Sequence, residues 1–209
     1  MHRSLIRHAS QAMEYPLVRV SGVWLLLIGT VIAVATLVGG RFELNPFVFM
    51  VGYGVSLFVT EFHPYVKTRF AGPGELNSFQ KKMARYGDIY LFPLMFIMGG
   101  SFIPSGDWRM VWLGTLLATG IHFLLFVPVH GKPMAHLSLL CSTIALAGML
   151  LSAVPFLYFG LLDGAVKMAF GIYLVSRRSS NQPPRVPAEL LDPHNAFDKK
   201  FAGEDEQRI

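Results

Sequence analysis

The chain has 209 residues, of which 53% are hydrophobic and only 15% are charged, and its mean hydropathy is +0.46. Ordinary soluble domains carry about 25% charged residues, so this composition argues against a water-soluble protein and predicts one solvated by lipid. The formal net charge is +5, but the basic residues stand at the ends of apolar runs and do not gather on one face, so nucleic acid is not a predicted partner. The single cysteine, Cys141, excludes an intrachain disulfide and a cysteine-rich zinc site.

Six apolar segments follow one another along the chain, each close to the ~20 residues with which a helix crosses a bilayer. A basic leader, residues 1–19, precedes them; it forms either a short interfacial helix or a partly ordered segment. The predicted transmembrane domain covers residues 20–175, and its spans are 20–39, 46–62, 86–103, 108–127, 133–151 and 155–175. Within the longest connection, residues 77–85 predict a short amphipathic helix along the membrane. The tail, residues 176–209, is rich in proline and charge, which predicts a disordered cytoplasmic segment.

The basic residues favour one orientation of these spans. With the amino terminus inside, twelve Lys or Arg residues lie near the membrane on the inner side, whereas the outer loops carry only Arg41 and Arg109. Multi-pass proteins keep such an excess on the cytoplasmic side, so the sequence predicts both termini in the cytoplasm and a place in the cell membrane. The twelve are Arg3, Arg7, Arg19, Lys67, Arg69, Lys81, Lys82, Arg85, Lys132, Arg177, Arg178 and Arg185.

The sixth span carries two charges near its middle, Asp163 and Lys167. A charge at mid-membrane costs about 2.5–3.5 kcal/mol on insertion scales, so such residues face other helices or a water-filled cavity. They are four residues apart with the acid first, the spacing and order that favour an ion pair along one helix. With a turn of about 100° per residue, small and polar residues share one face of the span. These are Gly160, Asp163, Gly164, Lys167 and Gly171.

The fourth span places small and hydrogen-bonding residues at helical spacing, among them Thr119 and His122. Both the fourth and the sixth span run inward, and His122 lies at nearly the same depth as Asp163 and Lys167. The sequence therefore predicts one intramembrane pocket that binds or transports a small solute or ion, with Asp163 as counter-charge, Lys167 as cation and His122 as titratable partner. The alternative for these residues is purely structural, with the charges neutralising each other and His122 bonded to a backbone carbonyl.

Two other functions stay open. Carboxylates and imidazoles gather near the inner ends of the spans, and they are the ligands that zinc or iron prefers, so a membrane-embedded metalloenzyme acting on lipid is one alternative. The candidate ligands are Glu61, His63, Asp88, His130 and His136. The spacing matches no known metal motif, and no cofactor is predicted. The other alternative is a non-catalytic assembly partner; a homo-oligomer is compatible with the sequence but not indicated by it.

Three stretches, RMVWLGTLLATGIHF, VHGKP and DGAVKMAFG, resemble an uncharacterised bacterial family of small six-span membrane proteins over residues 20–175. The resemblance implies a six-helix fold and carries no activity or site residue with it. The sequence as a whole predicts an all-α, six-helix transmembrane bundle with both termini cytoplasmic, whose surrounding partner is the lipid bilayer. Whether it is an enzyme is left open.

Overall fold

The computed structural model describes residues 15–177, and every regular element in this part of the chain is helical. Most of the predicted leader and nearly all of the predicted tail lie outside these residues. The elements are α2 (Val18–Leu37), η1 (Gly40–Phe42), α3 (Pro46–Leu57), η2 (Phe58–Phe62), α4 (Pro64–Phe70), α5 (Ser78–Met98), η3 (Gly100–Ser105), α6 (Trp108–His122), η4 (Phe123–Phe126), α7 (Val127–His130), α8 (Pro133–Leu150) and α9 (Phe156–Ser176).

Five helical segments are long and apolar enough to cross a membrane, namely Val18–Leu37, Ser78–Ser105, Trp108–His130, Pro133–Leu150 and Phe156–Ser176. A sixth is added if Pro46–Phe62 and Pro64–Phe70, which are bent by 60° relative to each other, count as one span. Large apolar side chains remain exposed on the outside, for example Phe47 at 75%, Phe96 at 72% and Leu150 at 82%. Exposed apolar surface of this extent is what a lipid-facing helix presents.

Two predicted boundaries were wrong. The helix expected at 77–85 is not separate: α5 begins at a capping box formed by Asn77 and Gln80 and continues to Met98, because no helix breaker stands between the charged and the apolar part. The fourth span does not end at Pro128, since this proline lies in the first turn of α7, where its missing N–H costs nothing. The Gln80 side chain also donates to the backbone carbonyl of Pro128 at 2.9 Å, which joins α5 to α7.

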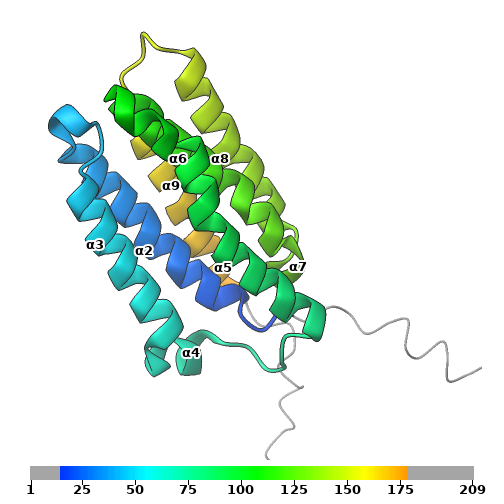
Figure 1. The fold of residues 1–209 in the computed structure, drawn as a ribbon. Helices are drawn as coiled ribbons and strands as arrows, with labels where there is room; N and C mark the ends of the chain where they lie inside the picture. The colour runs from blue at the N-terminus through cyan, green and yellow to red at the C-terminus, as the bar shows by residue number, and fades with distance from the viewer. Residues whose placement is uncertain (1–14, 178–209) are drawn as a thin grey trace, which may run out of the picture. The chain divides into compact units, whose positions relative to one another are not determined.

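The helices pack as an open ring in the order α3, α2, α9, α8, α6, α5 (Figure 1). Each helix packs on its neighbours in this order, but α3 and α5, at the two ends of the series, hardly touch each other within the described residues. We call the end of the ring where α2 begins and α9 ends the basal end, and the opposite end, with η1 and η3, the distal end. The Arg19 Nε donates to the Val175 carbonyl at 3.1 Å, so the described chain begins and ends on the same side.

The most extensive interface joins α2 and α9 through residues without side chains. A Cβ atom added to Gly29 would lie 2.6 Å from the Gly164 carbonyl oxygen, and one added to Gly22 would lie 2.9 Å from that of Gly171. Such close approach of two backbones is the usual basis of helix association in membranes. The glycines of the small face predicted on the sixth span, Gly160, Gly164 and Gly171, are therefore buried against α2.

The distal half of the ring is filled by one apolar cluster that includes Ile32, Phe49, Trp112, Leu113 and Phe156. The Trp112 indole donates to the Phe42 carbonyl at 2.7 Å and so joins α6 to η1. The Arg109 guanidinium donates to the carbonyls of Gly148, Leu151 and Val154 at 2.8, 3.1 and 2.8 Å. These bonds satisfy the Gly148 carbonyl in the last turn of α8, which has no partner within the helix, and join α6 to the turn that follows α8.

Candidate functional site

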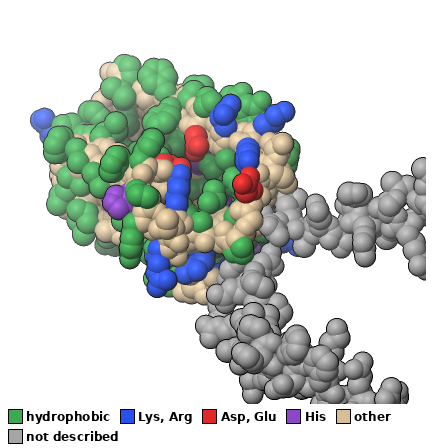
Figure 2. All heavy atoms as spheres, turned by 90° about the horizontal axis from the view of Figure 1, so that it is seen from below, with side chains coloured by type: hydrophobic (Ala, Val, Ile, Leu, Met, Phe, Trp, Pro, Cys, Tyr) green, Lys and Arg blue, Asp and Glu red, His purple; other side chains and the backbone are tan. Residues whose placement is uncertain are grey.

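A cavity of about 240 Å³ lies inside the ring, in its basal half. Its walls are mainly apolar and aromatic and come from every helix of the ring. Ile32, Phe49 and Leu116 line it on the distal side, where the apolar cluster closes it, and Glu61, Ala84 and His130 line it on the basal side. Figure 2 shows a hollow at the basal end with acidic and basic side chains around it.

The ion pair predicted on the sixth span is present. Lys167 Nζ donates to Asp163 Oδ2, and both side chains are almost fully buried. The pair has further neighbours: Lys167 Nζ lies 5.8 Å from the centre of the Phe123 ring, and the Cys141 thiol of α8 lies against both charges. Lys167 lines the cavity, whereas Asp163 stands behind it and leaves its Oδ1 atom without a hydrogen-bond partner in the described residues. We call the Asp163–Lys167 pair the polar floor of the cavity. It has no net charge, and Lys167 is the member of the pair that lines the cavity.

Two residues of α6, Thr119 and His122, line the same cavity. The Thr119 hydroxyl donates to the Leu116 carbonyl at 2.8 Å, as threonine commonly does inside a helix. His122 is 8% exposed, its ring meets Phe126 edge to face at 4.9 Å, and its Nδ1 atom has no partner among the described residues. Of the four predicted ligand residues, His122, Thr119 and Lys167 thus meet at one cavity, with Asp163 in contact with Lys167.

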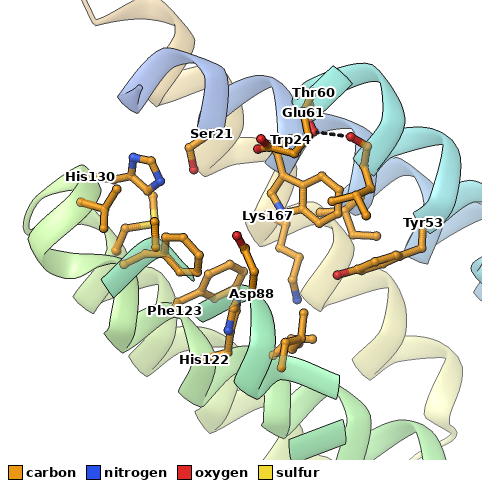
Figure 3. A pocket seen from close by; sticks show the side chains of 18 of the residues that line it. Ser21, Trp24, Tyr53, Thr60, Glu61, Asp88, His122, Phe123, His130 and Lys167 are labelled. Atoms are coloured by element: carbon orange, nitrogen blue, oxygen red, sulfur yellow. Dashed lines mark hydrogen bonds between the residues drawn. The ribbon is translucent and has the colours of Figure 1, made fainter. Parts of the chain in front are cut away.

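Residues from the other side of the ring complete the polar lining. Figure 3 shows Tyr53 of α3 and Asp88 of α5 pointing into the space that Lys167 and His122 also face. The Asp88 carboxylate is in electrostatic range of Glu61 and of the Tyr53 hydroxyl, and in the described residues it has no ion-pair partner. Glu61, by contrast, pairs with Lys67 at 3.2 Å.

Two aromatic residues of the cavity wall, Tyr53 and Trp24, had no predicted role. The sequence signal for Tyr53 is its hydroxyl group, which stands within the apolar first part of the second span, residues 46–55. Trp24 meets the Tyr53 ring edge to face at 5.2 Å, so the two residues form one aromatic corner between α2 and α3.

The five candidate metal ligands do not converge. Glu61, Asp88 and His130 line the cavity, but His63 and His136 are exposed and do not. In residues 15–177 no group of three His, Cys, Asp or Glu side chains is arranged to hold a metal ion. The geometry therefore gives no support to a metalloenzyme built on these residues.

A family of unknown function (DUF6609) matches residues 8–183, which is more than half of the chain. The chain belongs to this family. No curated protein and no solved structure matches the DUF6609 chain. Membership confirms the expectation of an uncharacterised family, while its bacterial distribution and its six spans stay predictions.

Proposed function

We propose that this DUF6609 protein crosses the cell membrane six times, with both termini in the cytoplasm, and binds a small solute in the cavity of its basal half. The observation that carries the proposal is the convergence of Lys167, His122 and Thr119 on one cavity inside apolar helices. Ligand sites are typically apolar pockets with a few convergent polar groups, and polar groups at membrane depth usually mark such a site.

The basic residues support this orientation. Among the described residues, eight Lys or Arg side chains belong to segments at the basal end, and two, Arg41 and Arg109, to the distal end. An even number of crossings agrees with the contact between Arg19 and Val175, which brings the first and last described helices to one side. The eight are Arg19, Lys67, Arg69, Lys81, Lys82, Arg85, Lys132 and Arg177.

The distance of Lys167 from the end of α9 supports a position of the polar floor near the middle of the bilayer. Lys167 is nine residues before the end of α9 at Ser176, a distance of about 14 Å at ~1.5 Å per residue. Half of a ~30 Å hydrocarbon core is about 15 Å. In the proposal Asp163 fixes and neutralises Lys167, the remaining N–H groups of Lys167 bind an acceptor of the solute, and His122 and Thr119 add hydrogen bonds.

The test compares purified wild-type protein with Asp163→Asn/Lys167→Met, which removes both charges and leaves neither alone. A panel of cavity-sized amines, alcohols and carboxylates is screened for thermal stabilisation. A ligand at a hundred times its Kd stabilises by about 2.7 kcal/mol. We expect at least one compound to stabilise the wild type and to lose this effect in the double variant. The control, Glu75→Gln/Lys81→Met, removes an exposed ion pair at the same end and should leave the effect intact.

Either of two results would contradict the proposal. One is a panel in which no compound stabilises the wild type. The other is a double variant that is folded and stabilised by the same compounds to the same degree, because the polar floor would then have no part in binding.

A further inference from the structure

The fixed charges around the cavity do not balance. Lys167 is neutralised by Asp163, and Glu61 is paired with Lys67. The described residues offer no counter-ion to the Asp88 carboxylate, which points into the cavity (Figure 3). The lining therefore carries one uncompensated negative charge, on a wall that is otherwise mainly apolar.

The cavity wall beside Asp88 is aromatic. Tyr53 and Trp24 form an edge-to-face pair at 5.2 Å, and Tyr53 also meets Phe92 of α5 at 6.4 Å. Aromatic faces attract cations through their quadrupole, most strongly where water is excluded. A carboxylate together with aromatic rings is the combination that recognises an ammonium group, and it disfavours a carboxylate or phosphate.

The ring of helices is also least closed beside this site. The helices α3 and α5 hardly touch, and the Tyr53–Phe92 ring contact bridges them next to Asp88. In the proposed membrane orientation this seam faces lipid, which suits a ligand with an apolar body, because that body partitions into lipid.

We propose that the cavity takes an amphipathic organic cation, whose positive head lies between Asp88 and the Tyr53–Trp24 pair and whose apolar body fills the space toward Phe49 and Leu116. This inference rests on the proposed function and names its ligand class. His122 and His130 line the same cavity and each leave a buried Nδ1 without a partner in residues 15–177, so the site also has unused capacity for a polar ligand group.

Two of the basic residues at the basal end already have acidic partners. Lys67 and Lys81 are engaged by Glu61 and Glu75 at 3.2 and 3.4 Å, and both lysines are exposed to solvent. Asp88 is itself exposed, but in the described residues it is the charged group of the cavity lining that has no ion-pair partner, so we assign it the ligand head.

Three compounds that share one compact cage test the charge of the ligand: 1-adamantylammonium, 1-adamantanol and adamantane-1-carboxylate. Their affinities for full-length protein in lipid nanodiscs are measured by titration calorimetry. We expect the ammonium compound to bind at least tenfold more tightly than the alcohol, and the carboxylate to bind more weakly than either. In Asp88→Asn the preference for ammonium over alcohol should fall about tenfold, with the affinity for the alcohol unchanged.

Two further variants complete the design. Tyr53→Leu retains apolar bulk but removes the ring, and it should lower the ammonium-to-alcohol ratio as well. Glu75→Gln removes an exposed carboxylate at the same end and should leave the ratio unchanged. An ammonium compound that binds no better than the alcohol, or an Asp88→Asn variant that keeps the wild-type ratio, would overturn the inference.

The same measurements separate this inference from the proposed function. The Asp163→Asn/Lys167→Met variant removes the N–H donors of the polar floor, so it should weaken binding of the two compounds that carry an acceptor, the alcohol and the carboxylate, and should not lower the affinity for the ammonium compound, in contrast to Asp88→Asn. Binding without charge preference would refute the cationic ligand class alone. Binding by none of the three compounds would also overturn the inference, and the wider panel described above decides the function separately.

Discussion

The strongest energetic prediction concerns the ion pair of α9. The side chains of Asp163 and Lys167 are 0% and 2% exposed, so removing one partner leaves the other charge buried without a counter-ion. Breaking a buried pair by removing one partner costs about 3–5 kcal/mol, whereas replacing both partners by neutral residues of similar volume is often neutral or stabilising. We therefore expect Lys167→Met and Asp163→Asn each to destabilise strongly, and the double variant to be about as stable as the wild type.

The size of the effect can be worked out. For a domain of ~150–250 residues, 1 kcal/mol shifts Tm by roughly 2–4 °C, so each single variant should lose about 6–20 °C.

Cys141, the chain's single cysteine, is 0% exposed and free, so a fluorogenic maleimide reports the unfolding of the helices around it. Far-ultraviolet circular dichroism on the same samples gives a readout that is independent of the thiol.

The control is Lys81→Met, which breaks an exposed ion pair and should cost less than about 1 kcal/mol. A double variant that melts as early as the single variants would refute the reasoning, because the loss would then come from packing and not from an uncompensated charge. Single variants that melt with the wild type would refute it as well.

Three other predictions follow from the packing and the orientation. Gly29→Leu should prevent the close approach of α2 and α9 and abolish the folded monodisperse peak in size-exclusion chromatography, whereas Gly54→Leu, with no atom within 4 Å of an added Cβ, should elute as the wild type. Arg109→Ala removes three charge-assisted hydrogen bonds and should lower Tm, since each such bond contributes about 1.5–3 kcal/mol; an unchanged Tm would contradict this. Cysteines introduced at Lys132 and Arg41 should be labelled by an impermeant maleimide from opposite sides of the membrane, and labelling from one side would refute the six-span orientation.

The positions of the helices could be predicted because they depend on local signals. Apolar runs of membrane length, with Pro46, Pro133 and Pro155 at or just before their starts, place three helices to within a residue or two. The Asp163–Lys167 pair could be predicted as well, because residues four apart on a helix are neighbours whatever surrounds them. The merging of residues 77–85 with the third span was missed, since the change from polar to apolar composition is no helix breaker.

The order of helices around the ring could not be read from the sequence. Asp88 lies ten residues into α5, and only the ring order shows that its carboxylate faces the cavity together with Tyr53 of α3. Gly22 and Gly29 are seven residues apart in α2 and oppose the glycines of α9, but two small residues at this spacing do not identify their partner. Which side chains face the cavity thus depends on contacts between segments that are distant in the chain, and a single sequence does not reveal these contacts.

The glycine contact between α2 and α9 has a consequence for biogenesis. All the other described helices, α3 to α8, are translated between α2 and α9. The helix α2 therefore enters the bilayer long before α9, the surface that covers it, has been made. Until α9 emerges from the ribosome, the backbone groove at Gly29 is open to lipids and to insertion factors. A nascent chain stopped before Phe156 should therefore be held by membrane chaperones or degraded, and the assembly of the bundle is completed by its last helix.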